Sequence, residues 1–162
     1  MTTIAIDKFG TIAADGQRCL GDELHDLRHR KIICRPAEGS RPARVFALAG
    51  AGSLELLLIE WYEAGHDPKV LPQIPSDTGW TLVIIEPTGT YYVPSNLPFK
   101  TRVTLPYAFG SGANYALGIL KDGQSAHRSV EVACEIDLYS GGEIQVVNIA
   151  EALGIPRLEA AE

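Results

Sequence analysis

The chain has 162 residues, a length that suits one domain. Hydrophobic residues make up 46% of it and charged residues 21%, which is typical of a globular protein with a buried core. The net charge of −6 and the pI of about 5.2 argue against a general nucleic-acid binder, which would carry a basic surface.

The first third of the chain predicts short strands. Residues 3–7 and 11–14 are β-branched or small and are separated by Lys8-Phe9-Gly10, which predicts a β-hairpin. The pattern then predicts an extended segment and two strands, over residues 17–22, 31–35 and 44–49. The Pro, Gly and Ser of residues 36–42 indicate a loop.

The middle of the chain predicts one helix and a second hairpin. Between Ser53 as N-cap and Gly65 as stop, apolar residues recur at helical spacing, which predicts a helix over residues 53–64. Residues 66–79 contain three prolines, and their apolar residues follow neither helical nor strand spacing, so we expect a loop. A hairpin follows over residues 81–86 and 90–93.

The last third predicts two helices between two strands. The helices are expected over residues 113–121 and 125–136, and the strands over residues 107–109 and 143–149. We expect residues 155–162 to fray as a tail. The order of elements predicts one α+β domain over residues 1–162, with two antiparallel sheets between helical layers.

The cysteines and the apolar pattern favour a cytoplasmic protein. Cys19, Cys34 and Cys134 form no CxxC pair, so neither a zinc site nor a disulfide framework is expected. Apolar runs are shorter than the roughly 20 residues of a membrane helix, and the first residues do not resemble a signal peptide. We therefore expect no membrane partner and no nucleic-acid partner.

Thr2 is a candidate nucleophile. Aminopeptidases commonly remove Met1 before a small residue, and this would leave Thr2 with a hydroxyl and a free α-amine. A free α-amine has a pKa of about 7.7–8.0, so it can take the hydroxyl proton near neutral pH. Many proteins begin with Met-Thr, so this feature alone is weak.

Asp15 and Lys31 strengthen the hypothesis. If their strands flank the N-terminal one, a buried Asp–Lys pair lies beside Thr2. The ammonium would favour deprotonated groups near it, and the carboxylate would offset the cost of burying it. Taken singly, Asp15 before a glycine is typical of a turn, and Lys31 at a strand start is typical of a solvated residue.

Seven short motifs, in order along nearly the whole chain, resemble the N-terminal-threonine peptidases of the proteasome β-subunit and HslV type. They are Thr2-Thr3-Ile4, Ala14-Asp15-Gly16-Gln17, Leu20-Gly21, Ala47-Leu48-Ala49-Gly50, Phe109-Gly110-Ser111-Gly112, Tyr115-Ala116-Leu117-Gly118 and Asp137-Leu138-Tyr139-Ser140-Gly141-Gly142. Asp15 and Lys31 follow Thr2 at nearly the family's spacing. The resemblance implies the four-layer αββα sandwich of N-terminal-nucleophile hydrolases.

The resemblance also implies a role for each residue. Thr2 would attack the peptide carbonyl, Lys31 would tune Thr2, and Asp15 would orient Lys31. Support for the α-amine and for a proton-carrying water would come from Ser111, Asp137 and Ser140. Taken singly, these three are also typical of a helix cap, a helix end and a turn.

Substrate contacts are implied at two segments. The backbone N–H of Ala49 or Gly50 would stabilise the oxyanion. A substrate peptide would add as a strand to residues 18–21 and 47–50, with Cys19, Gly21 and Ala47 contacting it. The family implies no cofactor and no metal, a polypeptide or peptide substrate, and a homo-oligomeric ring.

The sequence departs from the family between its first helix and the next hairpin. The family has two long helices here, whereas this chain has one short helix and the proline-rich stretch of residues 65–79. We therefore expect a shortened helical layer, and the family's ATPase unfoldase partner and ring size stay open for this chain.

Three alternatives remain open. The same fold can host a hydrolase of small amides, or a catalytically silent relative that forms rings. His25 and His29 have the i, i+4 spacing of metal ligands on a helix, but a solvated charged turn over residues 22–30 is the favoured interpretation.

Overall fold

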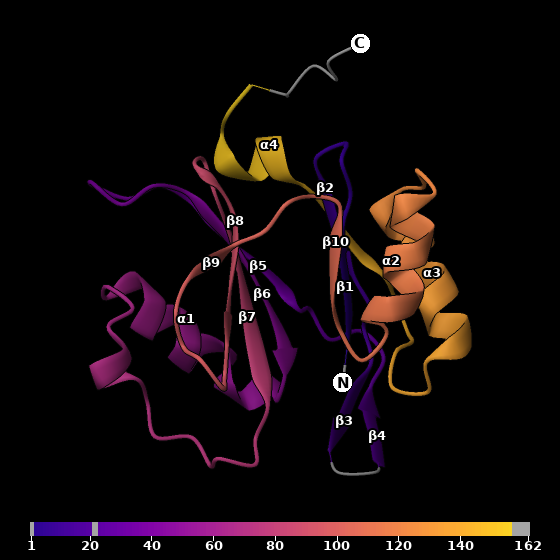
Figure 1. Ribbon diagram of the computed structural model, residues 1–162, viewed down its shortest axis with the longest axis horizontal. Helices are drawn as coiled ribbons and strands as arrows, with labels where there is room; N and C mark the ends of the chain where they lie inside the picture. The colour runs from indigo at the N-terminus through magenta and orange to yellow at the C-terminus, as the bar shows by residue number, and fades with distance from the viewer. Residues whose placement is uncertain (1, 21–22, 157–162) are drawn as a thin grey trace.

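Two antiparallel β-sheets are stacked face to face between helices (Figure 1). The computed structural model describes residues 2–20 and 23–156. The first sheet has the order β10–β1–β2–β11, formed by β1 (Thr3–Ile6), β2 (Thr11–Ala14), β10 (Tyr107–Gly110) and β11 (Gln145–Asn148). The second has the order β5–β6–β7–β8–β9, formed by β5 (Ile32–Arg35), β6 (Arg44–Gly50), β7 (Trp80–Glu86), β8 (Gly89–Pro94) and β9 (Thr101–Arg102).

Helices cover the outer faces of both sheets. The first sheet is covered by α2 (Ala113–Lys121) and α3 (Ala126–Ile136), and the second by α1 (Glu55–Glu63). The short helix α4 (Ile149–Leu153) closes one end of the sandwich (Figure 1). The predicted αββα architecture is confirmed.

The alternation of side chains along β1 explains the layering. Ile4 and Ile6 are completely buried between the two sheets, whereas Ala5 points to α2 and α3. Ala13 and Ala108 share the helix-facing side of this sheet. Because these side chains are so small, the two helices can approach the sheet closely.

The alternation along β6 matters for the site. Val45, Ala47 and Ala49 face the first sheet, whereas Phe46 and Leu48 face α1. The strand ends at Gly50, which has a φ of +137°, and a Cβ there would lie 2.8 Å from the carbonyl oxygen of Gly79. Glycine is therefore required where β6 leaves the sheet.

Several predicted boundaries differ from the structure. Residues 23–26, predicted as part of a solvated turn, form β4 (Glu23–Asp26), which pairs with β3 (Arg18–Leu20) as a separate hairpin. All four β4 residues are exposed, so no buried face marked the strand in the sequence. The predicted helix cap at Ser53 is wrong, since a 3₁₀ turn (Gly52–Leu54) precedes α1 and Leu54 is its N-cap.

The C-terminal prediction also needs correction. The predicted strand over residues 143–149 is shorter, because Asn148 caps α4 with its side chain and Gly154 ends that helix in a left-handed conformation. Ile155, predicted to begin a frayed tail, packs against the core and donates its backbone N–H to the Ala150 carbonyl.

The shortened helical layer is present as predicted. Within the described residues, α1 is the one α-helix packed on the outer face of the second sheet, and the segment that follows it holds a single 3₁₀ turn, η2 (Pro68–Val70). None of the helices in the described ranges is long and apolar enough to cross a membrane.

Candidate active site

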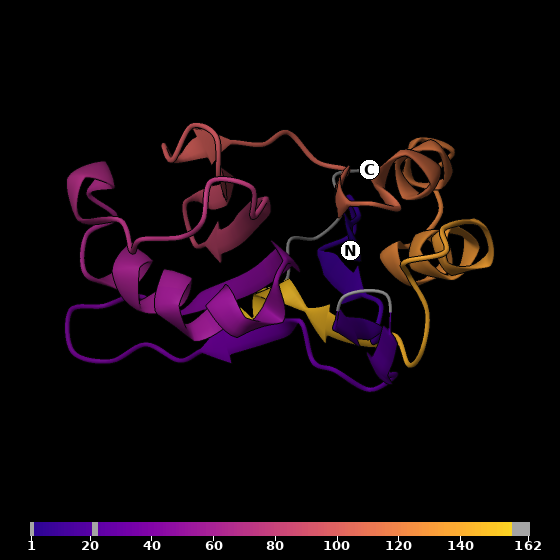
Figure 2. The same ribbon diagram turned by 90° about the horizontal axis from the view of Figure 1, so that it is seen from below.

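Thr2 directly precedes β1. Figure 2 shows the two sheets and the helices that flank them from below, the end at which the chain enters β1. Thr2 is 1% exposed, and it lines a cavity together with Lys31 and Gly50. Its backbone nitrogen donates a hydrogen bond to Ser111 Oγ at 3.1 Å. Met1 lies outside the described residues, so its predicted removal stays a prediction.

Asp15 and Lys31 form a buried ion pair next to Thr2. Lys31 Nζ lies 2.8 Å from Asp15 Oδ1, and the two side chains are 5% and 0% exposed. The same carboxylate oxygen accepts the backbone N–H of Thr3 at 2.9 Å. Asp15 therefore orients Lys31 and also holds the start of β1, and it is neither a solvated nor a turn residue.

The buried environment changes the acidity of Lys31. Burial lowers the pKa of its ammonium, and the charge and hydrogen bond of Asp15 only partly oppose this. Lys31 lines the same cavity as Thr2, so its positive charge lies close to the proposed nucleophile. Such a charge favours the deprotonated forms of neighbouring groups.

Backbone contacts fix the pair from two further directions. Asp15 Oδ2 accepts the N–H groups of Gln17 and Gly141, at 3.2 and 3.1 Å. Gln145, on β11, accepts the N–H of Lys31 at 3.1 Å and of Ile32 at 3.0 Å. Gln145 thus ties the start of β5 to the first sheet, a positioning role that the sequence did not indicate.

A second polar cluster lies on the other side of the Thr2 backbone. Ser111 Oγ and Ser140 Oγ both donate to Asp137 Oδ2, at 2.7 and 2.6 Å. Thr3 Oγ1 lies 2.7 Å from Ser140 Oγ and extends this chain of hydroxyls. The cluster leads from Asp137, through Ser111, to the Thr2 nitrogen.

This geometry bears on the simpler interpretations of Ser111 as a helix cap and of Asp137 as only a helix end. Gly112, and not Ser111, occupies the N-cap of α2, and it makes no side-chain cap. Asp137 does end α3, where a carboxylate is disfavoured by the helix dipole. Its carboxylate also accepts hydrogen bonds from the two serine hydroxyls, which stabilise it there.

Two glycines allow the chain to pass close to Thr2. A Cβ on Gly110, whose φ is +94°, would lie 2.0 Å from the Thr2 carbonyl oxygen. A Cβ on Gly112 would lie 1.9 Å from Thr3 Oγ1. Residues 110–112 can therefore lie against Thr2 and Thr3 only because Gly110 and Gly112 have no side chain.

Most of the predicted substrate residues lie at the site, with one correction. Cys19 and Gly50 line the Thr2 cavity, and Ala49 lines a neighbouring one. Ala47 does not line the Thr2 cavity: it is 1% exposed and faces the first sheet, because the period-2 alternation of β6 turns it inward. Leu48 lines the cavity in its place. Gly21 lies outside the described residues.

Further residues of the cavity wall were missed by the sequence analysis. These are His29, Gly52 and Glu55, and they lie beside Arg18, which belongs to the predicted substrate segment of residues 18–21. Burial lowers the pKa of His29, and the positive charges of Arg18 and Lys31 act in the same direction. Burial raises the pKa of Glu55, although Arg18 opposes the change. The wall is thus polar and carries groups of both signs.

The helical metal pair is not formed. His25 lies in β4 and His29 lies beyond its end, so the i, i+4 spacing does not place them on one helix face. Within the described ranges, His, Cys, Asp and Glu side chains form no group of three that could hold a metal ion.

Comparison of the whole fold with solved structures gives clear matches. HslV from Trypanosoma brucei is 18% identical, with a TM-score of 0.69 over 91% of this chain and 98% of its own. Thiobacillus denitrificans BPH in complex with epoxomicin is 21% identical, with a TM-score of 0.65 over 92% and 99% of the two chains. BPH alone is also 21% identical, with a TM-score of 0.64 over 92% and 98%.

Comparison at the level of sequence gives no such matches, since neither a protein-family model nor a curated protein matches the chain. At these low identities the structural likeness establishes the fold and not the activity. It covers nearly the whole of each chain, and it agrees with the resemblance found in the sequence motifs. This chain has the αββα fold of HslV and BPH.

Proposed function

We propose that this protein is an N-terminal-threonine hydrolase that cleaves peptide bonds. The observation that carries the proposal is the convergence of the Asp15–Lys31 pair and the Ser111–Asp137–Ser140 cluster on Thr2, beside a cavity. Asp15, Lys31, Asp137 and Ser140 are all buried. Three ionisable side chains and a hydroxyl buried around the second residue are costly for a purely structural role.

The reaction requires the removal of Met1. Thr2 Oγ then attacks the carbonyl carbon of the substrate while the α-amine of Thr2 takes the hydroxyl proton. The C–N bond breaks, the leaving nitrogen takes that proton, and an ester remains on Thr2. Water then hydrolyses the ester, releasing the acid and restoring the hydroxyl.

The surrounding residues support these steps. The positive charge of Lys31 favours the deprotonated hydroxyl and keeps the α-amine neutral near pH 7. Ser111 orients the nitrogen of Thr2. The Gly50 N–H is our candidate for the oxyanion donor, since Gly50 lines the Thr2 cavity and ends the strand that the substrate would extend.

The proposed assembly is a ring of identical chains, as the resemblance to proteasome β subunits implies. Large apolar side chains support it, since Leu24 and Leu138 are 57% and 86% exposed. An ATPase partner is not proposed, because α1 stands without a second helix on the outer face within the described residues. Light scattering of the purified protein tests the assembly, and a monomer would contradict it.

Intact-mass measurement with a peptide epoxyketone tests the chemistry. This electrophile has a ketone beside an epoxide, so it can react once with a hydroxyl and once with a free amine. We expect loss of Met1 and one adduct that maps to Thr2. Thr2→Ala should abolish the adduct, whereas Thr101→Ala, at an exposed threonine, should not. A protein that lacks Met1 yet forms no adduct and hydrolyses no peptide would refute the proposal.

A further inference from the structure

A second cavity lies on the other side of Gly50 from the Thr2 cavity. It measures about 370 Å³, and its walls come from the ends of β6, β7, β8 and β10. Gly50 lines both cavities, and Ser111 lines the second. A substrate whose scissile carbonyl lies at Gly50 would therefore reach into both.

Proton transfer decides which part of a substrate enters which cavity. In the proposed reaction the α-amine of Thr2 must give its proton to the leaving nitrogen, so the leaving group lies on the side of the Thr2 nitrogen. That nitrogen is bonded to Ser111 at 3.1 Å. The second cavity is therefore on the leaving-group side, and the Thr2 cavity takes the acyl side.

The second cavity continues into a third. Both are lined by Trp80, Ser95 and Asn96, and the third measures about 150 Å³. Two hydrogen bonds hold the shared wall together: the Ser95 N–H donates to the Trp80 carbonyl at 2.9 Å, and Ser95 Oγ accepts the Trp80 N–H at 3.3 Å. The side-chain amide of Asn96 is exposed, and it makes no hydrogen bond within the described residues.

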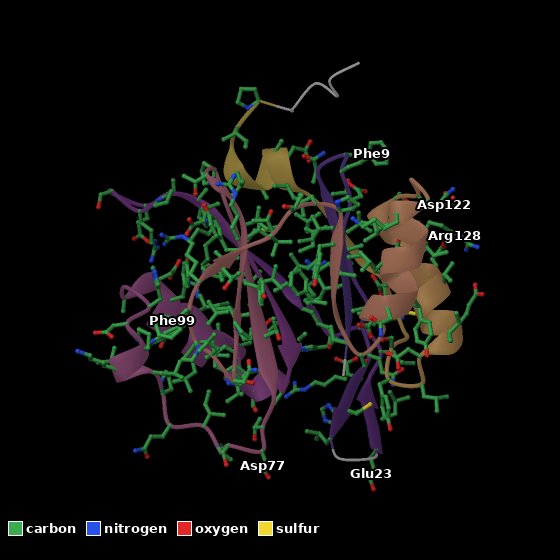
Figure 3. The ribbon with its side chains drawn as sticks, in the orientation of Figure 1. Phe9, Glu23, Asp77, Phe99, Asp122 and Arg128 are labelled. Carbon is green, nitrogen blue, oxygen red and sulfur yellow. The ribbon has the colours of Figure 1, made fainter. Side chains whose placement is uncertain are left out.

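The far wall of the third cavity comes from the proline-rich segment, residues 66–79. Leu71 and Ile74 line this cavity, and both are half-buried against the core beside α1. The prolines at 72 and 75 restrict the backbone between and after them. Asp77 of this segment lies at the same end of the molecule as Glu23 of the β3–β4 hairpin (Figure 3). Cys19 of that hairpin lines the Thr2 cavity.

We propose that the second and third cavities form one groove for the leaving-group side of a peptide substrate, with an apolar subsite at Leu71 and Ile74. The proposal rests on the proposed function and specifies its substrate: a polypeptide that continues past the scissile bond with an apolar side chain. Asn96 supplies a donor and an acceptor to the peptide backbone. The segment that replaces a helix thus serves as a substrate wall.

Two matched substrates test the groove. One is a peptidyl coumarin amide, which has no residues after the scissile bond, and the other is a quenched peptide with the same acyl side that continues with leucines. Burying one leucine or isoleucine contributes about 1.5–3 kcal/mol, so we expect kcat/KM to be at least about tenfold higher for the continued peptide.

Variants in the segment locate the effect. Ile74→Asp should lower kcat/KM for the continued peptide about tenfold and leave the coumarin amide unchanged. Val70→Asp is the matched control, because Val70 is 67% exposed in the same segment and lines neither cavity. Asn96→Ala removes an exposed side chain without disturbing packing, and it should also affect only the continued peptide.

The outcomes separate this proposal from the proposed function. Turnover of the coumarin amide with no preference for the continued peptide would overturn the groove and leave the hydrolase intact. If neither substrate is hydrolysed and Thr2 is not labelled, the proposed hydrolase function is itself overturned. Fluorescence anisotropy of the continued peptide on Thr2→Ala needs no turnover, and equal binding with and without Ile74→Asp would also overturn the groove.

Discussion

Lys31 Nζ and Asp15 Oδ1 lie 2.8 Å apart in the interior of the protein, with almost no access to solvent. The pair joins the residue that precedes β5 of the second sheet to the residue that follows β2 of the first. It therefore links the two halves of the sandwich at the point where the candidate nucleophile lies. Removing one partner leaves the other charge buried and unpaired.

Asp15→Asn should destabilise the protein by about 3–5 kcal/mol, because it leaves the Lys31 ammonium buried without a counter-charge. Labelling of Thr2 should be lost as well. Urea denaturation measures the loss of stability, and the epoxyketone adduct measures the labelling of Thr2.

Asp26→Asn is the control for Asp15→Asn: it makes the same charge change at an exposed site and should alter neither stability nor labelling. Adding Lys31→Gln to Asp15→Asn should recover stability but not labelling. Unchanged stability of Asp15→Asn would refute this account.

Gly110→Ala should lower the thermal midpoint and abolish Thr2 labelling, because the added Cβ meets the Thr2 carbonyl and the residue has a positive φ. Gly118→Ala is the control, since nothing lies within 4 Å of its Cβ on α2. That control should stabilise the helix by about 0.5–1 kcal/mol. Equal thermal midpoints for Gly110→Ala and Gly118→Ala would show that the close approach of Gly110 to Thr2 does not contribute to stability.

Gly52→Val should fill the Thr2 cavity, because its Cβ would already lie 3.2 Å from His29 Nε2. We expect peptide hydrolysis to fall by about tenfold or more while the protein stays folded, since Gly52 has an ordinary φ. Ser53→Val places the same side chain on the exposed neighbouring residue and should leave hydrolysis unchanged. Equal kcat/KM values for the two variants would show that substrate does not enter this cavity.

Glu86 should contribute to acid sensitivity. Burial alone would raise the pKa of this carboxyl, but hydrogen bonds from Tyr62, Lys100 and Arg44 outweigh it and hold the pKa below its usual value of 4.5. The folded state therefore binds the proton less well than the unfolded state. The stability from ionised Glu86 is complete above pH 4.5 and is lost as the pH falls through the lower folded value.

Glu86→Gln should remove this part of the pH dependence. Its free energy of unfolding should be lower than that of the wild type at pH 7, and the difference should shrink below pH 4.5. Glu60→Gln, at an exposed position of α1, should keep the wild-type profile. Denaturant titrations across this pH range measure the effect, and parallel profiles for wild type and Glu86→Gln would contradict it.

Much of the fold follows from local pattern in the sequence. Alternation, turn residues and helical spacing predicted a hairpin over residues 3–7 and 11–14, a strand over residues 44–49 and helices over residues 113–121 and 125–136. The structure has each of these elements to within one residue at each end. These signals work because the backbone allows only two common side-chain periods, and because Gly and Ser act at turns and caps through their own atoms. The strand β4 and the helix α4 were missed because neither presents a long periodic face.

The sequence by itself determined the residues on which the proposed chemistry rests: Thr2 as second residue, and the types and spacing of Asp15 and Lys31. The tertiary structure decided which groups meet. Packing of the two sheets buries Lys31 against Asp15, and it brings Asp137 to Ser111 from the far end of α3. It also placed Leu48, and not Ala47, in the lining of the Thr2 cavity, and Leu71 and Ile74 in the wall of another cavity. Such contacts depend on how elements that are far apart in the sequence pack together, and the spacing of residues within one element does not determine that packing.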